Sequence, residues 1–252
     1  MYKLDHIVHF VDHPEVLVDR MSDEGVRTVL GGKHEMWGTY NSLSYFENLS
    51  YIEYIGIFDE ELFNKSAKVP YTLHESYEKN NRRNGFTRIA LRTNTINEDA
   101  KRLKEAGLFV DGPKSFSRKR PDGTIVSWKL LHFGLEGNEL EFPFLIEWNL
   151  EDQERYNDLL RSGTLGHHPL GNLKIDSIVL TVKNLDKVRQ WSNLFNFELI
   201  ETTSLIKLVT PNCDLIFYYN RDAQNLITEV VISGASMEKT LKIDNANYKF
   251  IK

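Results

Sequence analysis

The sequence predicts an α+β fold made of tandem βαβββ modules. Three strand-like runs share one alternating pattern, and they cover residues 4–11, 86–93 and 175–182. Each run is followed by a helical pattern and then by further strands. Because side chains alternate along a strand, the runs superpose with Ile7, Ile89 and Ile178 on one face. The opposite face carries His6, Arg88 and Ser177. A repeated scaffold with one variable face predicts modules that line a shared cleft.

Module one contains a helix near residues 13–24. Asp12 can cap this helix, Pro14 suits its first turn, and Gly25 stands where a left-handed residue would end it. A break at Gly31-Gly32 then separates three predicted strands, at residues 26–30, 40–46 and 49–58. The first module therefore has the order βαβββ.

Module two repeats this order. Ile96, Ala100 and Leu103 recur at helical spacing, and Gly107 ends the helix. Three strands are predicted at residues 114–119, 124–133 and 141–148, with Pro121-Asp122-Gly123 as a turn. Module three has Asn184 as a helix cap, and strands are predicted at residues 198–202, 206–210 and 214–219. Residues 227–252 indicate a truncated fourth module, with strands at 227–233 and 248–251.

Polar, turn-rich joints at residues 65–85 and 149–173 predict the domain organisation. We expect modules one (1–80) and two (85–150) to pair within residues 1–150. Residues 151–172 then form a linker, and residues 173–252 hold the third module and the truncated fourth. Neither joint is of low complexity.

Composition limits the classes of function. Hydrophobic residues make up 41% of the chain and charged residues 27%, which is typical of a globular protein. The formal net charge of −5 argues against nucleic acid or an anionic membrane as the main partner. No apolar run approaches the length of a membrane span, and no signal peptide is indicated. The single Cys213 excludes an internal disulfide. These observations favour a cytoplasmic protein.

Several short motifs resemble the vicinal oxygen chelate superfamily and, within it, glyoxalase-like domain proteins. The motifs are Asp5-His6-Ile7-Val8, Gly31-Gly32-Lys33-His34, Gly38-Thr39-Tyr40-Asn41, Tyr51-Ile52-Glu53, Arg120-Pro121-Asp122-Gly123, Trp128, residues 143–148 and His168-Pro169-Leu170-Gly171. The resemblance implies that paired modules curl into an open half-barrel cleft, which in this superfamily usually holds a divalent metal. Reactions in the superfamily include isomerisation and ring cleavage, so that the resemblance implies architecture better than reaction.

The resemblance also implies a metal site. Ligands in the superfamily come from the first and last strands of paired modules, and the matching residues are His6, Glu53 and Glu147. Imidazole and carboxylate ligands suit zinc, nickel, manganese or iron. Module three has Ser177 and Phe217 at these positions, so we expect it to hold no metal. It would serve as a structural cover or as the contact of a homodimer.

Arg88 departs from the superfamily pattern at the fourth ligand position. A guanidinium stays protonated and cannot ligate a metal. Two hypotheses follow. Either three ligands hold the metal, or Arg88 replaces the metal by pairing with Glu53 and Glu147.

Other residues are candidates for binding and proton transfer. His34 lies in a glycine-rich loop, and His34 or Glu147 could move protons. The candidates for substrate binding are Arg88, Asn41, Arg120 and Trp128. His9 alternates with Ile7 and Val11 and is read as a core residue.

The sequence thus predicts a metal-dependent lyase, isomerase or dioxygenase that acts on a small oxygen-bearing molecule. Its ligand would combine an anionic or carbonyl oxygen with an apolar body, because cations fix the first and aromatic rings bury the second. The alternative is a metal-free protein of the same fold that binds or sequesters a small molecule.

Overall fold

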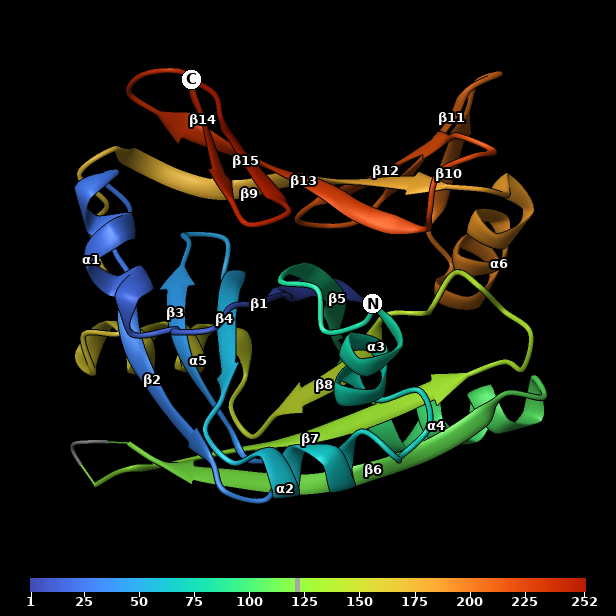
Figure 1. The fold of residues 1–252 in the computed structure, drawn as a ribbon, viewed down its shortest axis with the longest axis horizontal. Coiled ribbons are helices and arrows are strands. Elements are labelled where there is room, and N and C mark those ends of the chain that lie inside the picture. The colour runs from blue at the N-terminus through green and yellow to red at the C-terminus, as the bar shows by residue number, and fades with distance from the viewer. Residues whose placement is uncertain (121–122) are drawn as a thin grey trace.

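A computed structural model describes residues 1–120 and 123–252 of the protein. Two residues of the predicted turn, Pro121 and Asp122, lie outside the described residues. The described chain forms an α+β fold with two large sheets (Figure 1).

Sheet A is a curled half-barrel of eight strands built from modules one and two. Its spatial order is β2-β3-β4-β1-β5-β8-β7-β6, so β1 and β5 join the modules as antiparallel neighbours. The strands are β1 (Lys3–Phe10), β2 (Val29–His34), β3 (Thr39–Tyr45), β4 (Tyr51–Ile57), β5 (Gly85–Arg92), β6 (Phe109–Lys119), β7 (Ile125–Gly134) and β8 (Phe144–Trp148).

Sheet B repeats this plan with one strand fewer, in the order β10-β11-β12-β9-β13-β15-β14. Its strands are β9 (Gly171–Val182), β10 (Glu198–Glu201), β11 (Leu205–Val209), β12 (Asp214–Tyr219), β13 (Leu226–Ala235), β14 (Lys239–Ile243) and β15 (Ala246–Phe250). The last three strands correspond to the truncated fourth module.

Six helices are described: α1 (Val16–Asp23), α2 (Glu60–Ser66), α3 (Leu73–Lys79), α4 (Ile96–Glu105), α5 (Asp152–Arg161) and α6 (Leu185–Phe195). Figure 1 shows α1 and α6 near opposite ends of sheet B. Phe63 of α2 and Leu73 of α3 pack with Phe10 of β1 in a cluster separate from the core between the sheets. The Asn184 side chain accepts a hydrogen bond from the Asp186 N–H and caps α6, as predicted. None of the helices among the described residues is long and apolar enough to cross a membrane.

The largest core lies between the sheets. Ile7, Ile89 and Ile178 all belong to it, together with Trp191 of α6. The predicted apolar face of the three repeated strands is therefore confirmed. His9 is fully buried, as expected of a core residue, and its Nδ1 hydrogen-bonds the Tyr248 hydroxyl.

Three local predictions differ from the structure. Asp12 does not cap α1, because the helix begins at Val16, its N-cap residue is Glu15, and the cap has no side-chain hydrogen bond. Gly31 and Gly32 were expected to end a strand, but both lie inside β2, where Gly32 pairs with Asn41 of β3 and the register shifts between Leu30 and Gly32. Residues 65–85 were expected to be a polar joint, yet they include the end of α2 and all of α3. These two helices cover the hollow face of sheet A and position one wall of the site.

Candidate functional site

A cavity lies between the hollow face of sheet A and the segment that carries α2 and α3. Its volume is about 130 Å³. This is comparable to the roughly 150 Å³ of an apolar cavity that holds benzene. The aromatic residues of the wall, apart from its histidines, are Trp37, Tyr45, Tyr51, Phe116, Trp128, Phe144 and Trp148. Polar side chains, among them His6, Glu53 and Arg118, line the rest of the wall. Apolar walls with polar groups at fixed positions are typical of a pocket for a small organic ligand.

His6 and Glu53 meet in this cavity. His6 Nε2 lies 3.6 Å from Glu53 Oε2, and both side chains are buried. Val8 of β1 pairs with Glu53 of β4, so the parallel pairing brings the two residues to the same face of sheet A. The expected convergence of these two side chains is confirmed.

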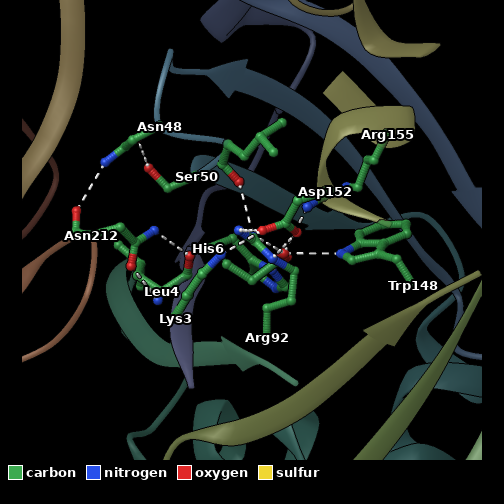
Figure 2. A network of polar contacts seen from close by, with 12 residues as sticks. Lys3, Leu4, His6, Asn48, Ser50, Arg92, Trp148, Asp152, Arg155 and Asn212 are labelled. Atoms are coloured by element: carbon green, nitrogen blue, oxygen red, sulfur yellow. Dashed lines mark hydrogen bonds and ion pairs between the residues drawn. The ribbon is translucent and has the colours of Figure 1, made fainter. Parts of the chain in front are cut away.

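Asp5 holds the far side of the His6 ring. Its Oδ1 lies 2.8 Å from His6 Nδ1, while its Oδ2 accepts hydrogen bonds from Arg92, Arg155 and Trp148 (Figure 2). Burial alone would raise the pKa of Asp5, but Arg155, His6 and Arg92 hold it well below its usual range. An ionised carboxylate only accepts hydrogen bonds, so His6 Nδ1 is the donor. The Nε2 atom of His6 is thereby turned toward Glu53.

Asn41 fixes Glu53 in the same way. Its amide Nδ2 donates to Glu53 Oε1 at 2.6 Å, and its carbonyl accepts from the Gly32 N–H at 3.0 Å. Asn41 lines the cavity, where a binding residue was expected, and its side chain hydrogen-bonds Gly32, Glu53 and Arg118. The carboxylate of Glu53 therefore has one oxygen held by Asn41 and one facing His6.

His34 and Trp128 also line the cavity, as expected. His34 Nδ1 shares a hydrogen bond of 3.0 Å with the Thr39 hydroxyl. Burial lowers the pKa of His34 to about 4, so its ring is neutral at pH 7. The neutral ring of His34 can hydrogen-bond a ligand oxygen without adding charge to the cavity.

Glu147 does not reach the cavity, and the expectation that it joins His6 and Glu53 is wrong. Its Oε2 accepts from the Ile96 N–H at the start of α4, and its Oε1 lies 2.7 Å from Lys129 Nζ. The cause is the register of β8. Ala90 is equivalent to Val8 in the repeat and pairs with Phe144, so Phe144 is the true counterpart of Glu53.

The strand register shows the same one-residue error in module three. Val179 is the counterpart of Val8 and pairs with Ile216, so Phe217 was assigned one residue away. Phe217 is fully buried in the core between the sheets.

Arg88 pairs with neither Glu53 nor Glu147, which contradicts the second hypothesis for this residue. Its guanidinium donates to the Ser76 hydroxyl at 2.7 Å and to the Phe142 carbonyl. The nearest carboxylate, that of Glu141, lies 3.8 Å away. Burial lowers the pKa of Arg88, with Glu141 opposing the shift. Arg88 does not line the cavity and instead ties β5 to α3 and the loop before β8.

Arg120 lies outside the cavity too, with its guanidinium on Asp158 at 2.6 Å. Its neighbour Arg118, which was not predicted as a site residue, lines the cavity. His74 and His132 were also missed, and both line it. His74 is placed by α3, whose Thr72 hydroxyl accepts from the Glu75 N–H. The Thr-x-x-Glu pattern is a signature of a helix start and could have located α3.

Comparisons with known proteins identify the fold. A family model described as a glyoxalase-like domain matches residues 4–195, and curated protein sequences gave no match. A hypothetical protein from Staphylococcus aureus is 24% identical, with a TM-score of 0.87 over 99% of this chain and 99% of that chain. The Mn(II)-bound glyoxalase from Novosphingobium aromaticivorans is 10% identical, with a TM-score of 0.55 over 98% of this chain and 81% of that chain.

These solved structures have little sequence identity to the chain, so they show a shared fold and not a shared reaction. The family model is more specific, because it spans most of the chain and includes His6, His34, Asn41 and Glu53. The chain belongs to the glyoxalase-like domain family of the vicinal oxygen chelate superfamily.

Proposed function

We propose that the protein is an enzyme of the isomerase or lyase type that moves a proton on a small oxygen-bearing molecule. The observation that carries this proposal is the buried pair of His6 and Glu53, whose Nε2 and Oε2 atoms lie 3.6 Å apart. Each member is held by a second group, Asp5 on His6 and Asn41 on Glu53. Such double support is what acid–base chemistry requires, because the reacting groups must be fixed before the substrate arrives.

The chain's own residues can carry out the proton transfer. Glu53 Oε2 would accept a proton from a carbon next to a carbonyl group. His6, when protonated at Nε2, would donate a hydrogen bond or a proton to the oxygen on which negative charge develops. The Asp5 carboxylate fixes the orientation of the His6 ring through its hydrogen bond with Nδ1.

The walls of the cavity favour a substrate with an apolar body. Trp37, Trp128 and Trp148 contribute ring surfaces, and Phe144 occupies the position that corresponds to Glu53 in module two. Burying rings against an apolar body is favourable, whereas a second carboxylate here would have required a cation.

The donor set does not fit a divalent metal held by both modules. Module one supplies His6 and Glu53, but the equivalent positions in module two are Arg88 and Phe144. Within residues 1–120 and 123–252, no three His, Cys, Asp or Glu side chains group as metal ligands. The glyoxalase from Novosphingobium aromaticivorans, which shares this fold, is Mn(II)-bound.

A second candidate is a protein that binds a small molecule without changing it. The cover formed by α2 and α3 favours this function, because side chains from Ser66 to His74 close one side of the cavity. The two functions share the ligand class and differ in the role of Glu53.

Hydrogen–deuterium exchange separates the two functions. We would incubate the protein in D2O with 2-oxobutyrate, 4-methyl-2-oxopentanoate or hydroxyacetone, and follow the loss of the C–H signal next to the carbonyl by NMR. The proposal expects exchange above the buffer rate that falls by about 100-fold or more in Glu53→Gln. Glu147→Gln is the matched control, because Glu147 faces α4, and it should exchange at the wild-type rate. Ligands that raise the melting temperature without any exchange would favour the binding protein.

A further inference from the structure

We propose that Arg118 binds a carboxylate group of the substrate and thereby selects small carboxylic acids. The inference rests on the proposed function and deepens it by naming the substrate class. Arg118 belongs to the basic stretch Arg118-Lys119-Arg120, which the acid–base pair leaves unexplained. It lies on β6, lines the cavity and is partly buried.

Two glycines of the opposite module make room for the Arg118 side chain. A Cβ atom built on Gly32 would lie 2.8 Å from Arg118 Cδ, and one on Gly31 would lie 2.9 Å from Arg118 Nη1. The side chain of β6 therefore lies directly against the backbone of β2. The edge strands of modules one and two approach each other at this point, and only residues without a side chain allow the arginine to lie there.

Arg118 differs from the nearby basic residues in that no carboxylate of a described residue pairs with its charge. Lys114, which lines the same cavity, lies 2.7 Å from an oxygen of Asp111, and Arg120 is paired with Asp158. The polar contact of Arg118 is the neutral carbonyl of Asn41, at 3.4 Å. No carboxylate in the described parts of the chain lies within ion-pair distance of it. A guanidinium presents a planar fork of donors that matches a carboxylate, so this one is suited to an anionic ligand.

The position of Arg118 would place a bound carboxylate close to the acid–base pair of His6 and Glu53. The Asn41 side-chain carbonyl accepts a hydrogen bond from Arg118, and its amide group donates one to Glu53. The other oxygen of Glu53 faces His6. A carboxylate bound by Arg118 would therefore lie one asparagine side chain away from Glu53. The carbon chain of a short oxo acid can span this interval, with its apolar end against the aromatic wall.

The size of the cavity favours a carboxylate over a larger anion. The main cavity measures about 130 Å³ and adjoins a second cavity of about 170 Å³, and both are lined by Tyr45, Arg118 and Trp148. Arg118 stands at the boundary between them. An acid with a small apolar body can fill the first cavity while its carboxylate meets the guanidinium at the boundary.

The test compares a carboxylate with its neutral amide. Dissociation constants of phenylacetate and phenylacetamide are measured by ligand-observed NMR with wild-type protein, Arg118→Met, Arg118→Lys and Arg120→Met. We expect wild-type protein to bind phenylacetate at least about tenfold more tightly than phenylacetamide. Arg118→Met should abolish this preference and Arg118→Lys should retain only part of it. Arg120 lines the second cavity, but its guanidinium is already paired with Asp158, so Arg120→Met should behave as wild type.

A second variant tests the same contact from the other module. Gly32→Ala keeps the charge of Arg118 but places a methyl group against its side chain, and it should also weaken the preference. Melting curves confirm that each variant is folded. A wild-type protein that binds acid and amide equally, or an unchanged preference in folded Arg118→Met, would overturn the proposal.

The two proposals fail independently. Glu53→Gln should keep the preference for phenylacetate, since Arg118 and its charge remain, although exchange of 2-oxobutyrate is lost. Exchange that is absent from the wild type while the acid preference persists would reject the proton-transfer function alone. If exchange depends on Glu53 but the protein binds phenylacetate no more tightly than phenylacetamide, only the role of Arg118 would be rejected.

Discussion

The carboxylate of Asp5 accepts a hydrogen bond of 2.8 Å from the ring of His6, its immediate neighbour in the sequence. Consecutive residues of a regular strand point to opposite faces, so this contact needs an irregular backbone. The pairing of β1 with β5 shifts register between Leu4 and His6, which marks a bulge at Asp5. Bulges re-aim side chains in this way and are frequent beside active sites.

The first prediction concerns the stability that depends on Asp5. Asp5→Asn keeps the size of the side chain but removes the anion between Arg92 and Arg155, both of which are buried. We expect the free energy of unfolding in urea at pH 7 to fall by about 3–5 kcal/mol.

The matched control is Asp158→Asn, which breaks the more exposed pair with Arg120. It should cost less than about 1 kcal/mol. Equal effects of the two substitutions would contradict the view that Asp5 is the buried anchor of this network.

The second prediction concerns Glu147. Its carboxylate caps α4 at the Ile96 N–H and pairs with Lys129, on the face of sheet A that points away from the cavity. Glu147→Gln retains an oxygen for the cap and loses the ion pair, so the free energy of unfolding should fall by less than about 1 kcal/mol. Binding of phenylacetate should be unchanged. If the folded Glu147→Gln protein loses ligand binding, Glu147 would have to be part of the binding site.

These residues show how far the sequence could predict the site. The repeated alternation placed His6 correctly, because the parity of a strand follows from its own residues. Glu147 failed because its face depends on how β8 pairs with β5, and a shift of one residue reverses the face of every side chain. Asp5 was missed because the bulge that turns it toward His6 arises between strands.

The cover of the cavity was missed for a different reason. Residues 60–79 form two short helices with charged outer faces, and neither has enough apolar periodicity to stand out from a polar joint. Their stability comes from packing of residues such as Phe63 and Leu73 against the hollow of sheet A. The βαβββ modules were predictable because the same order of elements repeats along the chain, whereas the half-barrel was expected from the resemblance to the superfamily.

The third prediction concerns metal content. Protein without an affinity tag, loaded with Mn²⁺ or Zn²⁺ and then passed through a desalting column, should retain well below one metal per chain. The reason is that His6 and Glu53 are the aligned donors in the cavity, while Phe144 occupies the matching position of module two. Elemental analysis gives the stoichiometry. One tightly held equivalent that disappears in Glu53→Gln would show that these two residues suffice to hold a metal.

The fourth prediction concerns stability at low pH. Burial lowers the pKa of His34 to about 4 and those of His74 and His132 to about 3. These histidines titrate near pH 6.5 in the unfolded chain, so that below this pH the unfolded state binds more protons than the folded state. The free energy of unfolding should therefore fall as the pH drops from 6.5 toward 4, by up to about 1.4 kcal/mol per pH unit for each histidine. Asp5, whose pKa is also lowered, adds to this loss only near pH 4 and below.

His74→Leu isolates one of these terms. The His74 ring packs against Trp37 and Phe63, and its Nε2 has no hydrogen-bond partner among the described residues. Replacing this ring with leucine therefore leaves no partner of Nε2 without a hydrogen bond. The variant should lose less stability than the wild type between pH 6.5 and pH 5, by about one histidine's share. Urea unfolding curves at pH 7.0, 6.0 and 5.0 measure the difference. Identical pH dependence in the two proteins would mean that His74 binds a proton equally well in the folded and unfolded states. That result would contradict the claim that burial keeps the His74 ring neutral.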